Sequence, residues 1–322
     1  MTLVGPSLAT SITTATPGVP DTAFVVFASP EPRCLGAVGL FTAYQADSIC
    51  ILRVADEENA DREANIAELH RSCGPVGKIV DCPTEHADPL LGIDRILASV
   101  ASAKPGAVVT VDISTFPRNS LLLVLRALHG VNPALQLRLV YTEPGTYNVP
   151  SAPTSSGLCT IEVVPTYSAP YKADEELVLV IFLGFERDRV LGLWQSIAPH
   201  KTIVVIGDPP YRTEWTGVSE HINAALLAGL SDDSVYRVDP RNPSATFRLL
   251  EKLIGEREHR DNYYIAPFGT KPQTVGVFSF CERYPKLANV VYAAPVAKSE
   301  DYLAAGIGPT WFLPVDLRAE TV

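Results

Sequence analysis

The sequence predicts an α/β protein built from two units in tandem, each formed around a parallel sheet. Short, continuously apolar runs alternate with helix-compatible segments, which is the order expected of parallel strands covered on both faces. The same order begins again after a segment rich in Pro, Ser and Thr, and we expect this segment, residues 148–172, to be a linker. A chain of 322 residues also fits two domains, at roughly 100 to 200 residues each.

The first unit is expected to span residues 21–147. Its strands are predicted at five apolar runs, residues 23–28, 48–52, 78–81, 107–113 and 137–141. Helices are predicted between them at 59–72, 88–103 and 119–130. Residues 1–20 carry no Lys or Arg and are broken by Pro and Gly, so we expect a flexible arm and no signal peptide.

The second unit is expected to span residues 173–322, and one short strand is predicted in the linker near 160–164. Strands are predicted at 177–183, 202–206, 235–238, 262–266 and 288–292. Helices are predicted at 187–197, 219–230, 242–258 and 270–283. Repeated β-α-β order makes both units Rossmann-like.

Matching landmarks recur in the two units in the same order, which indicates an internal duplication. Arg33-Cys-Leu-Gly corresponds to Arg189-Val-Leu-Gly, after the first strand of each unit. Thr115-Phe-Pro-Arg corresponds to Thr270-Lys-Pro-Gln, at a later strand-to-helix turn. Tyr-Thr-Glu-Pro at 141–144 corresponds to Tyr-Ala-Ala-Pro at 292–295. We therefore interpret the chain as two diverged copies of one unit.

Composition excludes several classes of protein. With 26 Lys and Arg against 36 Asp and Glu, the formal charge is −10, which argues against general nucleic-acid binding but leaves room for a small anion in a local basic pocket. No apolar run reaches the 18 residues of a membrane span. The six cysteines form no CxxC pair, so we expect no metal site and a reducing, cytoplasmic setting.

The clearest candidate for a ligand site follows the fourth strand of the second unit. Ligands of parallel sheets bind outside the carboxyl ends of the strands, where helices begin. Here the turn supplies a glycine for close backbone approach, an N-cap, a cation and an amide: Gly269, Thr270, Lys271 and Gln273. Such a turn can hold a phosphate. The alternative is a well-capped helix start with Lys271 in solvent.

The corresponding turn of the first unit offers Ser114, Thr115 and Arg118 to an anion, although Asp112 would oppose one. Structural capping is the preferred interpretation there. Charged turns after the first strand of each unit add Arg33, Arg187 and Arg189 as ligand contacts. The alternative is that neighbouring glutamates pair with these arginines and hold the turns.

Catalytic and cofactor signatures are missing from the sequence. It contains no GxGxxG, Walker A, GxSxG or HExxH motif, so we expect no nicotinamide, flavin or other bound cofactor. The weak candidates for acid–base chemistry are Asp208 and Asp239, which both end strands of the second unit. A carboxylate pair at that edge would be needed for them to act together.

The turn Ala266-Pro-Phe-Gly-Thr-Lys-Pro-Gln273, with Leu183-Gly-Phe185 in smaller part, resembles the CRISPR-associated Rossmann-fold (CARF) sensors and their fused SAVED relatives. The resemblance covers the second unit directly and the first only through the duplication, because the first lacks the Gly-Thr-Lys triplet. It implies a nucleotide second messenger such as a cyclic oligonucleotide, a role in antiviral defence, and ligand contacts at Gly269, Thr270, Lys271 and Gln273. The sequence shows no attached effector domain, so a partner protein would supply the output.

The function expected from these observations is a sensor that binds a nucleotide or another phosphate-bearing ligand and catalyses no reaction. Two alternatives stay open. One is an enzyme acting on a small nucleotide or phosphosugar through Asp208 or Asp239. The other is a ligand-free scaffold that holds partners in a multiprotein complex.

Overall fold

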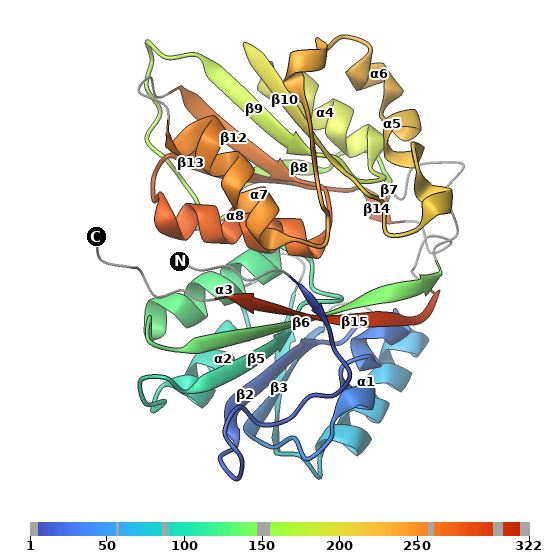
Figure 1. Ribbon diagram of the computed structural model, residues 1–322, viewed down its shortest axis with the longest axis vertical. Helices are drawn as coiled ribbons and strands as arrows, with labels where there is room; N and C mark the ends of the chain where they lie inside the picture. The colour runs from blue at the N-terminus through green and yellow to red at the C-terminus, as the bar shows by residue number, and fades with distance from the viewer. Residues whose placement is uncertain are drawn as a thin grey trace. The chain divides into compact units, whose positions relative to one another are not determined.

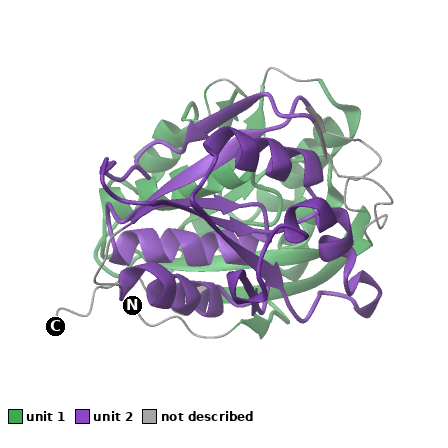
Figure 2. Ribbon diagram, turned by 90° about the horizontal axis from the view of Figure 1, so that it is seen from above, with its two compact units in different colours: residues 1–148, 303–322 green, residues 149–302 purple. Residues whose placement is uncertain are grey.

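The computed structural model describes residues 6–55, 58–85, 88, 90–146, 155–256, 261–298 and 305–315. It confirms the α/β class, with two sheets of mostly parallel strands and helices packed on them (Figure 1). The chain divides into two compact units (Figure 2). Unit 1 comprises residues 1–148 and 303–322, and unit 2 comprises residues 149–302.

The described residues of unit 1 form a seven-stranded sheet in the order β1-β15-β6-β5-β2-β3-β4. Strands β2 to β6 are parallel, whereas β15 runs antiparallel to β6 and β1 antiparallel to β15. The strands are β1 (Ser7–Leu8), β2 (Asp21–Phe27), β3 (Ala46–Val54), β4 (Lys78–Thr84), β5 (Val108–Asp112), β6 (Gln136–Thr146) and β15 (Ala305–Val315). The helices are α1 (Ala60–Cys73), α2 (Ile93–Val100) and α3 (Arg118–Val131), with 3-10 turns η1 (Pro32–Leu35) and η2 (Val38–Leu40).

The main sheet of unit 2 has the order β11-β10-β9-β12-β13-β8 over the described residues, and only β8 is antiparallel to its neighbour. Its strands are β8 (Thr160–Val163), β9 (Leu177–Phe182), β10 (Lys201–Gly207), β11 (Val235–Val238), β12 (Asn262–Pro267) and β13 (Ala288–Ala294). A small second sheet pairs β7 (Ser155–Ser156) with β14 (Ala297–Lys298). The helices are α4 (Arg187–Ile197), α5 (Val218–Ile222), α6 (Ala224–Leu227), α7 (Pro243–Leu250) and α8 (Lys271–Arg283), and the turns are η3 (Thr213–Trp215), η4 (Asp232–Ser234) and the π-turn η5 (Glu251–Gly255).

The central strands of both sheets are buried on both faces, as their continuous apolar runs predict. In unit 1, α1 covers one face through Leu69 and Cys73. In unit 2, α4 and α6 cover one face through Val190, Leu193 and Leu226. Helices α7 and α8 pack tightly against each other, since a Cβ at Gly276 would lie 2.5 Å from the Cβ of Thr246.

The strand orders of the two sheets correspond. Unit 1 reads β4-β3-β2-β5-β6-β15, with β1 beyond β15, and unit 2 reads β11-β10-β9-β12-β13-β8. In each unit, the strand after the five parallel ones is antiparallel to them. The duplication remains an interpretation, which this correspondence supports. The antiparallel strand comes after the parallel strands in unit 1 and before them in unit 2.

Three segments differ from the boundaries expected from the sequence. Residues 305–315 were expected in the second unit but pair with β6 of unit 1, where Trp311 lies opposite Tyr141. The expected linker, 148–172, contributes β8 to the sheet of unit 2, although residues 147–154 lie outside the described ranges. The described part of the expected arm, residues 6–20, is held to unit 1 by β1 and by the fully buried Ile12.

Three predicted helices are also shorter than expected. The helix predicted at 88–103 corresponds to α2, which spans Ile93–Val100. The segment 219–230 contains two short helices, α5 and α6, separated at Asn223. The side-chain amide of the buried Asn223 donates to the carbonyls of Gly184 and Ser219, so it is used in tertiary contacts at this break. Helix α7 passes into the π-turn η5 before residue 256.

In the described residues, no helix is long and apolar enough to cross a membrane.

Candidate functional site

The strand order of unit 2 places a topological switch point between β9 and β12, because the chain leaves these neighbouring strands in opposite directions. Ligands of such sheets bind at this crevice, outside the carboxyl ends of the strands. The turns after β9 and β12 touch here, since a Cβ at Gly184 would lie 2.3 Å from the carbonyl oxygen of Phe268. From the segment after β10, Ser219 Oγ donates to the Gly184 carbonyl at 3.0 Å. This switch point is the candidate site.

The turn after β12 is a complete capping box. Thr270 is the N-cap of α8, and its hydroxyl accepts from the Gln273 amide at 3.3 Å. In return, the Gln273 side-chain oxygen accepts from the Thr270 amide at 2.8 Å. A Cβ at Gly269 would lie 2.1 Å from that oxygen, so a side chain there would displace the Gln273 amide from the cap. Gly269 and Gln273 therefore have a structural role, and their predicted ligand contacts remain predictions.

The Gln273 side chain is almost wholly buried, with 1% exposed. Its Nε2 has no hydrogen-bond partner among the described residues. Thr270 has a second role, because its hydroxyl donates to the Pro240 carbonyl at 2.6 Å. Tyr211, after β10, donates to the same carbonyl at 3.1 Å. The turns that follow β9, β10, β11 and β12 thus meet around the start of α8.

Replacing Thr270 by alanine is expected to lower the free energy of unfolding by about 1 to 2 kcal/mol, because the helix loses its N-cap and Pro240 loses a donor. Thr270→Ser keeps the hydroxyl and is the matched control. Urea unfolding followed by circular dichroism measures both. Equal stability of the alanine and serine variants would contradict the capping role.

Arg189 lies in the protein interior. Its Nε donates to the carbonyl of Ala293 at 2.7 Å, and its Nη1 pairs with Glu186 at 2.6 Å. The guanidinium also lies 5.3 Å from the ring centre of Phe268 and 5.6 Å from that of Tyr292. Only 4% of Arg189 is exposed, so this arginine joins α4 to β13 and the turn after β12. The contacts of Arg189 therefore agree with the alternative that a neighbouring glutamate pairs with it and holds the turn.

Arg187 lies two residues before Arg189 and is exposed, and its Nε pairs with Asp188 at 3.1 Å. Asp239, after β11, accepts from the amide of Arg241 at 2.9 Å, which holds its own turn. Asp208, after β10, is exposed. The catalytic carboxylate pair of Asp208 and Asp239 therefore stays a prediction.

Sequence reasoning missed a cluster of planar side chains at the same edge. The Arg241 guanidinium lies 4.2 Å from the ring centre of Tyr211 and donates through Nη2 to the Tyr211 carbonyl at 2.9 Å. Arg212 lies 5.8 Å from the ring centre of Trp215, and Phe185 meets Trp215 edge to face. One signal in the sequence could have indicated this cluster. An arginine or an aromatic residue follows each of the neighbouring strands β10 and β11.

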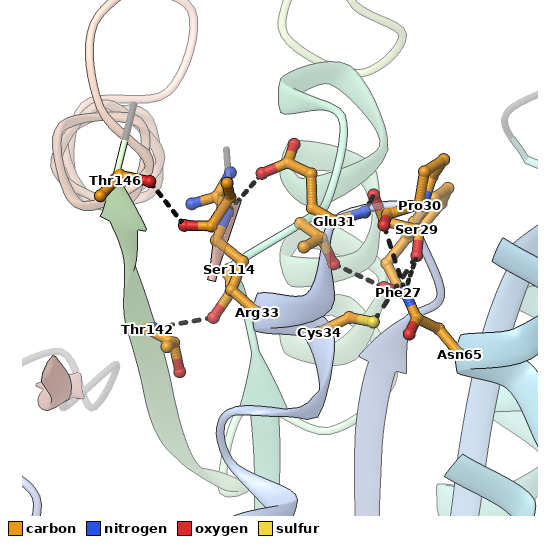
Figure 3. A network of polar contacts seen from close by, with 12 residues as sticks. Phe27, Ser29, Pro30, Glu31, Arg33, Cys34, Asn65, Ser114, Thr142 and Thr146 are labelled. Atoms are coloured by element: carbon orange, nitrogen blue, oxygen red, sulfur yellow. Dashed lines mark hydrogen bonds and ion pairs between the residues drawn. The ribbon is translucent and has the colours of Figure 1, made fainter. Parts of the chain in front are cut away.

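The corresponding edge of unit 1 lies at the carboxyl ends of β2 and β5 (Figure 3). Asp112 Oδ1 accepts from the amide of Ser114 at 3.0 Å and from its hydroxyl. Ser114 Oγ in turn accepts from the amide of Thr142 at 2.8 Å, and the Thr115 hydroxyl donates to the Phe27 carbonyl at 2.5 Å. Helix α3 begins after Pro117 with no side-chain cap. Ser114 and Thr115 thus join strand ends, which corrects the expectation that they cap the helix.

Two charged groups of this edge are buried. They are Arg33 and Asp112. The Arg33 Nε pairs with Glu31 at 2.6 Å, as expected if a neighbouring glutamate holds the turn. Arg118, at the start of α3, is half-buried. Burial raises the pKa of Asp112 to about 7, against the opposing effects of the Ser114 hydrogen bonds and the Arg33 charge. The carboxyl is therefore neutral below that pH and opposes an anion less than the sequence suggests.

Neither the protein-family models nor the curated proteins contain a match to this chain. Among solved structures, the chain is similar to the cytoplasmic domain of a prokaryotic cation chloride cotransporter, with 10% identity and a TM-score of 0.29 over 86% of this chain and 96% of that one. A similarity at this level supports no conclusion about function. Within the described ranges, no cluster of three or more His, Cys, Asp or Glu residues could hold a metal ion.

Proposed function

We propose that the chain binds a nucleotide at the carboxyl edge of the unit 2 sheet and acts as a sensor for it, passing the signal to a partner effector protein. The observation that carries the proposal is the meeting of four strand-end turns at the start of α8, at the switch point of the sheet. Parallel sheets bind their ligands at this position.

The start of α8 suits a phosphate. The helix has 13 residues, begins at Lys271 and has no acidic residue in its first turn, so its positive end and a cation act in the same direction. Gly184 and Gly269 add no side chain of their own to the turns beside the start of α8. A phosphate group placed here would meet Lys271, because the capping box already uses the amides of Thr270 and Gln273 and Pro272 has no N–H.

The planar cluster after β10 and β11 supports a nucleotide over inorganic phosphate alone. Nucleobases stack on aromatic rings and on guanidinium planes. Tyr211 and Arg241, which are both half-buried, supply such planes beside the turn that would hold the phosphate. The resemblance of the Gly-Thr-Lys turn to CARF sensors makes a cyclic oligonucleotide the first ligand to test, with antiviral defence as the associated role.

The test is incubation of the protein with a panel of mononucleotides, cyclic oligonucleotides and inorganic phosphate, followed by thermal unfolding and mass analysis of the ligand. A sensor is stabilised by its ligand, by about 2.7 kcal/mol at a hundredfold excess over Kd, and returns it intact. Conversion of the ligand would support the enzyme alternative. The absence of any thermal shift over the panel would overturn the proposal and favour the scaffold.

Lys271→Ala is expected to weaken binding of the ligand found in this way by about tenfold to a hundredfold, because one charge-assisted hydrogen bond is lost. Lys201→Ala is the control, since Lys201 is exposed at the start of β10, the opposite edge of the same sheet. Isothermal titration calorimetry measures both variants. Unchanged affinity in Lys271→Ala would refute the phosphate site.

A further inference from the structure

The carboxyl edge of unit 1 contains one buried guanidinium and two carboxyl groups. Arg33 is 5% exposed and Asp112 is 1% exposed. The Arg33 side chain pairs with Glu31, whose side chain is 18% exposed (Figure 3). The two acids therefore differ in their access to water, and the arginine pairs with the more exposed one.

The hydrogen bonds of the Asp112 carboxyl involve one of its two oxygens. Oδ1 accepts from both the amide and the hydroxyl of Ser114. Oδ2 is buried and has no hydrogen-bond partner among the described residues. A buried polar atom without a partner costs free energy, and the cost is larger when the group is ionised. A charge on Asp112 thus requires a donor at Oδ2.

The 3-10 turn η1, which carries Arg33, is packed onto the strands beside Asp112. A Cβ at Gly36 would lie 2.5 Å from the Thr142 hydroxyl, and the Thr142 amide donates to the Ser114 hydroxyl that binds Asp112. Arg33 is close enough for its charge to lower the pKa of Asp112, although burial has the larger and opposite effect.

We propose that Asp112 and Glu31 compete for the Arg33 guanidinium, and that the proton on Asp112 decides which of them holds it. With Asp112 neutral, Arg33 pairs with Glu31 as observed. Loss of the proton places a charge at Oδ2, and Arg33, which has five N–H donors, turns toward it. Glu31 then moves into water, at little cost because it is already partly exposed.

Other charged and titratable groups lie on the elements around Asp112. Glu143 on β6 accepts from the indole of Trp311 at 2.7 Å. Burial raises the pKa of the Cys34 thiol on η1 to about 12, so it stays protonated in the neutral range. Arg118 lies at the start of α3. The change of partner therefore follows the proton on Asp112, and it connects pH to the position of Arg33 at the carboxyl edge of the unit 1 sheet.

Amide hydrogen exchange of the whole chain between pH 5.5 and 8.5 tests the proposal. The reporters are the backbone bonds of the turn, from the Cys34 amide to the Glu31 carbonyl and from the Gly36 amide to the Arg33 carbonyl. After correction for intrinsic rates, we expect exchange in peptides covering 29–40 to rise about tenfold between pH 6 and 8, as the ionised fraction of a group titrating near pH 7 does.

Asp112→Asn keeps the shape of the side chain and its hydrogen bonds with Ser114, but it has no proton that titrates. The exchange of peptides 29–40 in this variant should therefore not change with pH. Glu31→Gln removes the competitor, and the midpoint should move about one pH unit lower. Asp81→Asn is the control on the surface of unit 1, where Asp81 pairs with His70, and it should keep the wild-type profile. A wild-type profile in Asp112→Asn, or an unshifted midpoint in Glu31→Gln, would overturn the proposal.

Discussion

Asp112→Asn is expected to stabilise the protein by up to about 4 kcal/mol at pH 8 and to have little effect near pH 4. The carboxyl has a folded-state pKa of about 7, raised from 3.8 chiefly by burial. The folded state therefore holds the proton more tightly than the unfolded state. Stability from this group is fully present below pH 3.8 and is lost as the pH rises toward 7. The loss is about 1.4 kcal/mol for each pH unit that separates the folded and unfolded pKa values.

Urea unfolding of wild type and Asp112→Asn at several pH values measures this effect. The difference between the two proteins should grow from pH 4 to 7 and stay constant above that. Pairing of Arg33 with ionised Asp112 would recover part of the cost, so the size of the plateau also reports on the proposed change of partner. A difference that does not vary with pH would show that Asp112 titrates in its ordinary range.

Gly184→Ala is expected to destabilise the protein by about 3 kcal/mol, because the new methyl group overlaps backbone that cannot move aside. Its Cβ would lie 2.3 Å from the carbonyl oxygen of Phe268. Both residues follow central strands, β9 and β12, that are paired along their length. Relief of the overlap would have to separate the two turns that form the candidate site.

Gly229→Ala is the matched control, since the nearest atom to its added Cβ is the Leu226 carbonyl oxygen at 3.8 Å. Thermal and urea unfolding compare the two variants, and calorimetry with the identified nucleotide reports on the site. We expect Gly184→Ala to lose both stability and affinity while Gly229→Ala keeps both. Equal stability of the two alanine variants would show that the turns after β9 and β12 are not closely packed.

The sequence was most informative about the parallel strands. Continuous apolar runs at 177–183 and 262–266 predicted β9 and β12 to within a residue at either end, because a strand covered on both faces must be apolar throughout. The residue types of the turn at Thr270 likewise predicted a capped helix start. In these cases the residues of the segment itself were sufficient to predict its structure.

The remaining features depend on residues far away in the chain. Strand β15 was missed because glycines and prolines, at 306, 308, 309 and 314, interrupt its apolar pattern. Its partner β6 also lies far away in the sequence, before the whole of unit 2. The burial of Arg189 depends on the Ala293 carbonyl and the Tyr292 ring. The packing of Arg241 on Tyr211 joins turns about 30 residues apart. No local pattern specifies such contacts.

The return of β15 to β6 makes unit 1 discontinuous, with the whole of unit 2 inserted between its two segments. A ribosome therefore completes unit 2 before it delivers the strand that covers the β6 edge of the unit 1 sheet. Until then that edge exposes unpaired backbone groups to other chains. For the same reason, residues 149–302 form a continuous segment suitable for separate expression, whereas unit 1 needs a new connection between residues 148 and 303.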